Sequence, residues 1–251
     1  MKKYVEEYYL PCYESDMNMI MTPYAFLDHA QEIANRSAEE LGFGRNELMK
    51  NDCAWILSRM HVIFHQMPHW QDKISLKTWH KGMRSLFYMR DFSLHDYMGN
   101  LLVSATSSWL VLNLETRRIS RSHELAERYA ECIEEDAIEE SAPKLMLPDD
   151  AKEKMELAKI HNVCYSDIDG NRHVNNVKYV VWAMDAIGMD ITSKKSVKEL
   201  KINFNHEIKP GDRVEIYKES RETENGLLFT VAGIVTGSTE KTPSFIAELL
   251  F

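Results

Sequence analysis

The sequence predicts an α+β protein made of two similar units, each with one helix packed on an antiparallel sheet. Two observations support this fold class. Segments rich in β-branched and aromatic residues follow a single long helical segment, and the same order of elements returns in the second half of the chain. A length of 251 residues is compatible with one or two domains.

The first half begins with residues 4–16, which alternate weakly between polar and apolar, as a strand would. Residues 23–42 then carry apolar side chains at helical spacing, with Thr22 as N-cap, Pro23 in the first turn and Gly42 at the end. Four strand-like segments follow, separated by turn residues: 54–64, 72–82, 84–96 and 100–113. We therefore expect one long helix followed by an antiparallel meander.

The second half repeats this order. A strand-like stretch at 159–169 leads into a helical pattern at 174–190, and four further strand-like segments follow at 196–208, 212–220, 227–236 and 244–251. Between the halves, acidic residues dominate 124–140, and Pro143 and Pro148 interrupt any continuous helix. We expect an N-terminal unit at 1–122, a connector at 123–160 and a C-terminal unit at 161–251.

An ungapped alignment supports an internal repeat. Residues 62–64 match 202–204, residues 72–76 match 212–216, and Tyr24 is placed opposite Tyr179. Each unit leaves sheet edges to pair, so two units can join their sheets into one long sheet. This is the architecture of a tandem, or double, hotdog fold.

Composition excludes several classes of function. The 30 basic and 39 acidic residues give a net charge of −9, which argues against broad nucleic-acid binding. No stretch is apolar enough for a membrane helix, and the N-terminus lacks the apolar region of a secretory signal. The four widely spaced cysteines suggest reduced thiols in a cytoplasmic protein. We expect no metal and no cofactor, and either a monomer or a homodimer.

The most polar cluster lies at 165–179, where the second unit passes from its first strand to its helix. A helix N-terminus offers unpaired N–H groups, here those of Val174 and Asn175, that can polarise a carbonyl, and His173 could move protons near neutral pH. The equivalent loop of the first unit, 13–24, is shorter between its flanking tyrosines and contains no His. Met67 stands opposite Glu207. We therefore expect one active site, built mainly by residues of the second unit.

Other readings of this region remain open. Asx and Gly residues also suit a tight turn followed by an N-cap, which would explain Asp167 and Gly170 without chemistry. Cys164 is expected to be a buried, inert thiol.

Basic residues gather in the first half despite the acidic total, either as a solvated surface or as a landing patch for an acidic partner. They are Lys81, Arg84, Arg90, Arg117, Arg118 and Arg121.

These segments resemble the acyl-ACP thioesterases, which release fatty acids in plants and bacteria and have a double-hotdog fold. The resemblance runs through residues 55–79, 90–92, 107–121, 165–182 and 204–208, and so covers nearly the whole chain apart from 124–155. It implies a thioester hydrolase of fatty-acid metabolism that acts on acyl chains carried by acyl carrier protein. An acyl-CoA thioesterase, a non-catalytic acyl-binding module and, with less support, a hydratase on the same fold remain alternatives.

By the same resemblance, the family's catalytic Asp, Asn and His fall on Asp169, Asn171 and His173, and its catalytic Glu falls on Glu207. Plant members have a Cys after that Glu, where this chain has Ile208, which favours attack by water. The acyl chain would enter an apolar tunnel, mainly in the first unit. Candidate tunnel residues, which could equally be ordinary core, are Met17, Met19, Trp55, Met60 and Phe64.

Overall fold

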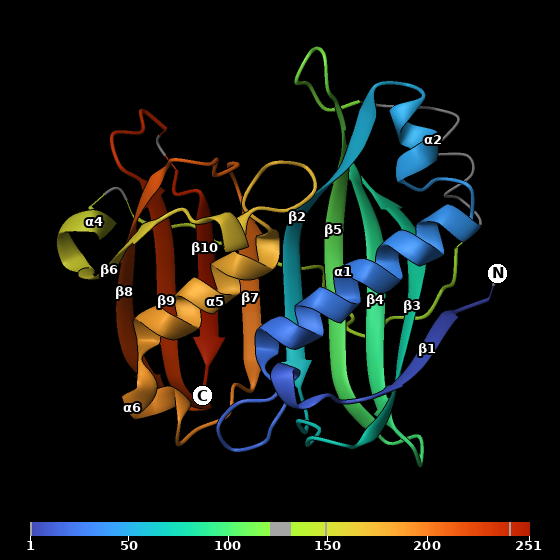
Figure 1. The fold of residues 1–251 in the computed structure, drawn as a ribbon, viewed down its shortest axis with the longest axis horizontal. Coiled ribbons are helices and arrows are strands. Elements are labelled where there is room, and N and C mark those ends of the chain that lie inside the picture. The colour runs from blue at the N-terminus through green and yellow to red at the C-terminus, as the bar shows by residue number, and fades with distance from the viewer. Residues whose placement is uncertain (1, 121–131, 149, 241) are drawn as a thin grey trace. The chain divides into compact units, whose positions relative to one another are not determined.

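The computed structural model describes residues 2–120, 132–148, 150–240 and 242–251. The chain divides into two compact units, Met1–Pro143 and Lys144–Phe251. Each unit is an antiparallel sheet with one long helix across a face (Figure 1). No described helix combines the length and apolarity needed to cross a membrane.

The first unit has five strands in the order β1-β3-β4-β5-β2, all antiparallel. The helix α1 (Pro23–Glu40) begins as predicted, with the Thr22 hydroxyl accepting the Ala25 N–H at 3.3 Å. Its apolar face buries Phe26 and Ile33 completely. The remaining bounds are β1 (Tyr4–Tyr9), η1 (Cys12–Glu14), α2 (Arg45–Met49), β2 (Cys53–Phe64), β3 (Lys73–Arg84), β4 (Phe87–Asp96) and β5 (Leu101–Asn113).

The second unit repeats this plan with the order β7-β10-β9-β8-β6, again antiparallel. Its long helix is α5 (Asn176–Ile187), which packs on β6, β8, β9 and β10. The remaining bounds are α4 (Ala151–Lys154), β6 (Glu156–Asn162), η2 (Tyr165–Asp167), α6 (Met189–Thr192), β7 (Glu199–Phe204), β8 (Arg213–Thr223), β9 (Gly226–Val235) and β10 (Phe245–Leu250).

The two units correspond element by element, so the predicted internal repeat is present. In each, a short strand leads into a single 3-10 turn, a polar loop and the long helix. The N-cap residues Thr22 and Asn175 are equivalent, because each donates its N–H to the carbonyl of the last 3-10 residue, Glu14 or Asp167. Counting from these caps places Tyr179 opposite Phe26, so the alignment of Tyr24 with Tyr179 is wrong by one half-turn of helix.

Residues 135–141 of the connector lie against the first unit, whereas the residues from Lys144 onward belong to the second unit. The Trp79 Nε1–H donates to the Glu135 carbonyl at 2.7 Å, and the Ala137 N–H donates to the Asp91 carboxylate at 2.7 Å. Lys81 lies between two carboxylates, 3.0 Å from Asp91 and 2.5 Å from Asp136. The second sheet starts at Glu156, earlier than the residue 161 at which the sequence places the second unit.

Candidate functional site

A tight loop between η2 and α5 carries most of the candidate residues. The Asp169 carboxylate accepts the Asn171 N–H at 2.8 Å and the Asn171 side-chain Nδ2–H at 3.3 Å, forming an Asx turn. Arg172 has a positive φ of 65°, which reverses the chain. The His173 carbonyl then accepts the Asp169 N–H at 2.9 Å and closes the loop.

The first unit contains the same loop with the same backbone bonds. The Asp16 carboxylate accepts the Asn18 N–H at 2.8 Å, Met19 has a φ of 63°, and the Ile20 carbonyl accepts the Asp16 N–H at 2.8 Å. The loops therefore match residue for residue, and the expectation of a shorter first loop is wrong, because it rested on tyrosines that are not equivalent. Asp169 and Asn171 have loop-building counterparts, whereas His173 stands where the first unit has Ile20.

The structure also brings together two predicted catalytic side chains that are far apart in the sequence, His173 and Glu207. The His173 Nε2 lies 3.5 Å from the Glu207 Oε2, and the two side chains are 33% and 27% exposed. Both groups therefore reach solvent while facing each other. The counterpart of Glu207 is Met67, as predicted, since the Val174 N–H donates to Ile208 O and the Met21 N–H donates to Pro68 O, each at 2.9 Å.

The backbone beside Glu207 is held by the start of α5. The Tyr179 hydroxyl accepts the Ile208 N–H at 3.3 Å. Burial raises the pKa of this phenol, and the negative charges of Glu207 and Asp169 add to the effect, so it stays protonated. The first unit has Phe26 and Pro68 at these places, and Pro68 has no N–H that needs an acceptor. Tyr179 is a residue that the sequence analysis missed; correct alignment of the helices would have found it.

The two backbone amides predicted to polarise a substrate carbonyl are occupied. The Val174 N–H donates to Ile208 O, and the Asn175 N–H donates to Asp167 O, each at 2.9 Å. In the first turn of α5, the Val177 N–H donates to the Asn175 side chain at 3.0 Å. The Asn176 N–H is left without an acceptor within the described parts of the chain. Of these neighbouring amides, the Asn176 N–H is therefore the one that has a hydrogen free to donate.

The predicted tunnel residues separate into three kinds. Met17 and Met19 are 65% and 48% exposed on the Asx loop, which turns them outward, so the prediction that they line a tunnel in the first unit is wrong. Met60 and Phe64 are core residues. Trp55 borders a small, half-open pocket within the first unit, with Ala34, Asn35, Ala38, Phe43, Arg90 and Trp109 as its other lining residues.

The predicted basic patch is only partly available to a partner. The Lys81 side chain is 4% exposed and paired with buried Asp91, and Arg90 is 4% exposed with bonds to the Ser37 and Thr78 hydroxyls. Lys81 and Arg90 therefore bind other side chains inside the protein, and the prediction that they form part of a docking surface is wrong for these two residues. Arg84, Arg117 and Arg118 are exposed, and Arg121 lies outside the described residues.

Comparisons with known proteins agree across nearly the whole chain. Residues 1–129 match the family model described as the acyl-ACP thioesterase N-terminal domain, and residues 150–243 match that of the C-terminal domain. The chain is 27% identical to oleoyl-acyl carrier protein thioesterase 2 of Arabidopsis thaliana, over 94% of this chain and 67% of that protein. It is 30% identical to an acyl-[acyl-carrier-protein] hydrolase of Cuphea viscosissima, over 80% of this chain and 52% of that protein. The chain thus spans about half to two thirds of the length of these relatives.

Solved structures agree on the fold. A crystal structure of an acyl-ACP thioesterase from Bacteroides thetaiotaomicron has a TM-score of 0.86 at 24% identity, with 99% of this chain and 97% of that chain covered. The 12:0-ACP thioesterase of Umbellularia californica has a TM-score of 0.85 at 22% identity, with 99% and 93% covered. The tandem hotdog prediction is thereby confirmed.

Proposed function

Because the chain belongs to the acyl-ACP thioesterase family, we propose that it hydrolyses the thioester of a fatty acyl-acyl carrier protein and releases the free fatty acid. One observation carries this proposal to particular residues. The two units share a loop backbone, yet among the described residues this loop carries a His that faces a Glu in the second unit alone, with His173 and Glu207 3.5 Å apart.

In the proposed mechanism the thioester carbonyl lies at the start of α5. Its oxygen accepts a hydrogen bond from the Asn176 N–H, and the helix dipole favours the negative charge that this oxygen gains. The counterpart of Asn176 in the first unit is Pro23, which has no N–H. The donor therefore belongs to the same unit as the His–Glu pair.

The nucleophile is a water molecule activated by this pair. Glu207, assisted by His173, takes a proton from the water as its oxygen bonds to the carbonyl carbon. The tetrahedral adduct then expels the phosphopantetheine sulfur, which leaves as a thiol after receiving a proton. Asp169 holds the loop that presents His173, and the exposed Asn171 amide positions the water or the thioester. General-base catalysis of this kind contributes about 10²–10⁴-fold.

The proposed partner is acyl carrier protein, whose acidic surface would meet the exposed Arg84, Arg117 and Arg118. The experiment compares hydrolysis of one acyl group carried by acyl carrier protein and by CoA. It uses the wild type, His173→Ala, Glu207→Ala and the matched control Met67→Ala. We expect turnover of the carrier-linked substrate, lost in the two site variants and retained in the control.

The other results have definite meanings. Turnover of acyl-CoA alone would keep the chemistry and replace the partner. Acyl binding without turnover of either substrate would leave a lipid-binding module and overturn the enzymatic proposal. Full activity of His173→Ala and Glu207→Ala would place the chemistry elsewhere.

A further inference from the structure

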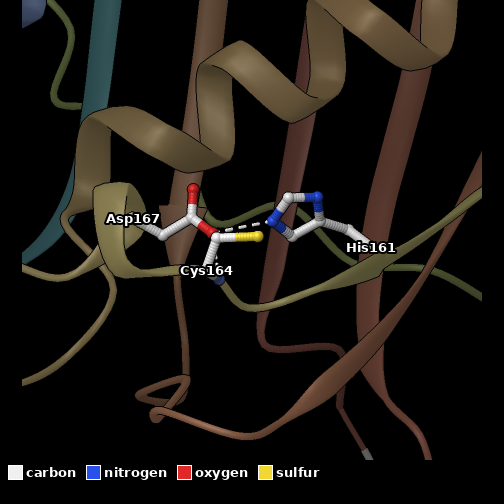
Figure 2. Close-up of side chains that lie close together, drawn as sticks. All are labelled: His161, Cys164 and Asp167. Carbon is white, nitrogen blue, oxygen red and sulfur yellow. Dashed lines mark hydrogen bonds and ion pairs between the residues drawn. The ribbon is translucent and has the colours of Figure 1, made fainter.

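Three potential metal ligands converge where β6 ends and η2 begins (Figure 2). His161, Cys164 and Asp167 each offer one ligand atom, and these atoms all lie within 4.8 Å of one another. The His161 Nε2 is 2.8 Å from the Asp167 Oδ2, and their side chains are 18% and 7% exposed. We propose that this cluster binds a thiophilic divalent cation of the Zn²⁺ type.

The donor set suits such a cation. Imidazole nitrogen, thiolate sulfur and carboxylate oxygen are the usual ligands of Zn²⁺, at about 2.0–2.3 Å from the metal. Ligand atoms around one such ion are then roughly 3–4 Å apart, so the cluster needs side-chain adjustments of about 1 Å. Cys164 is exposed, contrary to the buried thiol expected from the sequence, so the ion can enter and can keep a water as its fourth ligand.

Binding has a simple proton balance. The Cys164 thiol releases its proton to solvent when the sulfur bonds to the metal. The His161 Nε2 exchanges its hydrogen bond with Asp167 for a metal bond, and the neutral imidazole carries its proton on Nδ1. The Asp167 carboxylate keeps the Cys164 N–H that it accepts at 2.7 Å, which orients it as a ligand.

The geometry differs from that of a nucleophilic triad. In a triad the thiol and the carboxylate bond to opposite nitrogens of the imidazole. Here the sulfur and the bonded carboxylate oxygen both lie toward the same ring nitrogen (Figure 2). The Cys164 Sγ–H instead donates to the Asn162 carbonyl at 3.1 Å. Convergence on one point is the arrangement that a metal ion requires.

The first unit provides an internal comparison. It also pairs a His with the carboxylate at the end of its 3-10 turn, since the His29 Nε2 lies 2.8 Å from the Glu14 Oε2. There the His comes from the helix and stacks on Tyr8, whereas His161 comes from the strand and packs on Trp182. The His–carboxylate pair thus serves both units structurally.

The thiol is what distinguishes the second unit. The N-cap of η2 is Cys164, and the N-cap of η1 is Pro11, which has no ligand atom in its side chain. The second unit therefore adds a third ligand to a pair that both units already hold. Within the described ranges, this cluster is the one group of three such ligands.

Occupancy would act on the start of α5. The Asp167 carbonyl accepts the N-cap Asn175 N–H at 2.9 Å, and the His161 ring lies 4.4 Å from the Trp182 ring on the same helix. A metal bound to both residues would hold β6, η2 and α5 together. We therefore expect the cation to stabilise the second unit.

The test uses the untagged full chain, freed of metal by a chelator, and Co²⁺ as the probe. We expect a thiolate-to-cobalt charge-transfer band that saturates at one equivalent and is removed by Zn²⁺. Cys164→Ser should lose the band, and His161→Gln should lose saturation at one equivalent. Cys12→Ser should keep both, because Cys12 is an exposed thiol in the equivalent turn of the first unit and lacks the converging ligands.

A second measurement does not depend on spectroscopy or activity. Zn²⁺ should raise the Tm of the wild type and of Cys12→Ser, because a ligand that binds the folded state stabilises it, and should leave the Tm of Cys164→Ser unchanged. Circular dichroism verifies that each variant is folded. Three results would each overturn the proposal. They are the absence of the cobalt band in the wild type, a cobalt band that survives in Cys164→Ser, and an equal loss of the band in Cys12→Ser.

Discussion

Pro23 and Asn176 occupy the same first position of the two long helices, and only Asn176 has a backbone N–H. Proline suits this position because its ring fixes a helical φ and its missing N–H needs no acceptor within the helix. The difference is therefore neutral for helix formation, and it gives the second unit alone a backbone N–H at the place where we propose that the carbonyl oxygen binds.

Replacing Asn176 with Pro should remove the proposed donor while keeping α5. We expect kcat to fall about 10²–10³-fold, the usual effect of losing one such hydrogen bond. Asn176→Ala keeps the N–H and should retain most of the activity, which separates the backbone from the side chain. Equal activity in the two variants would show that this amide does not contact the reacting carbonyl.

The two Asx loops permit a matched comparison of stability and activity. Asp16→Ala removes the carboxylate that accepts the Asn18 and Ile20 N–H groups. Asp169→Ala removes the carboxylate that accepts the Asn171 N–H. Each should cost about 1.5–3 kcal/mol of unfolding free energy, the range for hydrogen bonds to charged groups. Urea unfolding measures this cost. Only Asp169→Ala should also lower kcat; an equal decrease in both variants would count against a local effect on His173.

Lys81 should matter for folding rather than for partner binding. Lys81→Met leaves the buried Asp91 carboxylate without its cation, which should cost about 3–5 kcal/mol. Burial raises the pKa of Asp91, and the positive charge of Lys81 partly offsets this increase. Removing Lys81 should therefore raise the pKa of Asp91 further. The loss of unfolding free energy should therefore be larger at neutral pH than in acid, because in acid Asp91 is protonated in both the folded and the unfolded chain. Adding Asp91→Asn should restore much of the stability, and KM for the carrier-linked substrate should not change.

His80 should make the protein less stable in acid. Burial lowers the pKa of His80 from 6.5 to about 4, with the positive charge of Arg90 as a second cause. Between these values the unfolded chain binds a proton that the folded chain excludes, so stability falls as the pH is lowered through this range. Chemical unfolding at a series of pH values should give a shallower slope for His80→Gln. An unchanged slope would mean that other groups govern the acid limb.

Charge at the exposed part of the basic patch should affect the choice of carrier. Arg118→Glu should raise KM for acyl-acyl carrier protein several-fold at low salt, and less at high salt, because screening weakens the attraction. Arg221→Glu alters an exposed arginine of the second unit outside the patch and serves as the control. A similar rise in both variants would point to net charge rather than to a docking site.

The fold could be predicted because its signals are local and repeated. Helical spacing after Thr22 and strand segments between turns identified the elements, and two short ungapped matches identified the repeat. The helix register was missed because Tyr24 and Tyr179 look alike. Their true relation depends on the N-cap bonds of Thr22 and Asn175, which a sequence does not display.

The sequence could suggest candidate residues for the site, but it could not show their hydrogen bonds. His173 and Glu207 could be selected because the first unit lacks both. The sequence analysis treated the Val174 and Asn175 N–H groups as unpaired. Their acceptors, Ile208 O and Asp167 O, are brought to them by the path of the folded backbone, which the sequence does not display. Likewise, basic residues look alike in a sequence whether they are exposed, as Arg118 is, or enclosed, as Lys81 is.

The shared loop backbone has a consequence for how such a repeat can change. Among the differences at matching positions, three concern the proposed reaction: His173 stands for Ile20, Asn176 for Pro23 and Glu207 for Met67. No insertion or deletion lies between them in the loop. The loop of the first unit could therefore be given the proposed site by point substitutions alone, without any change in its length or backbone.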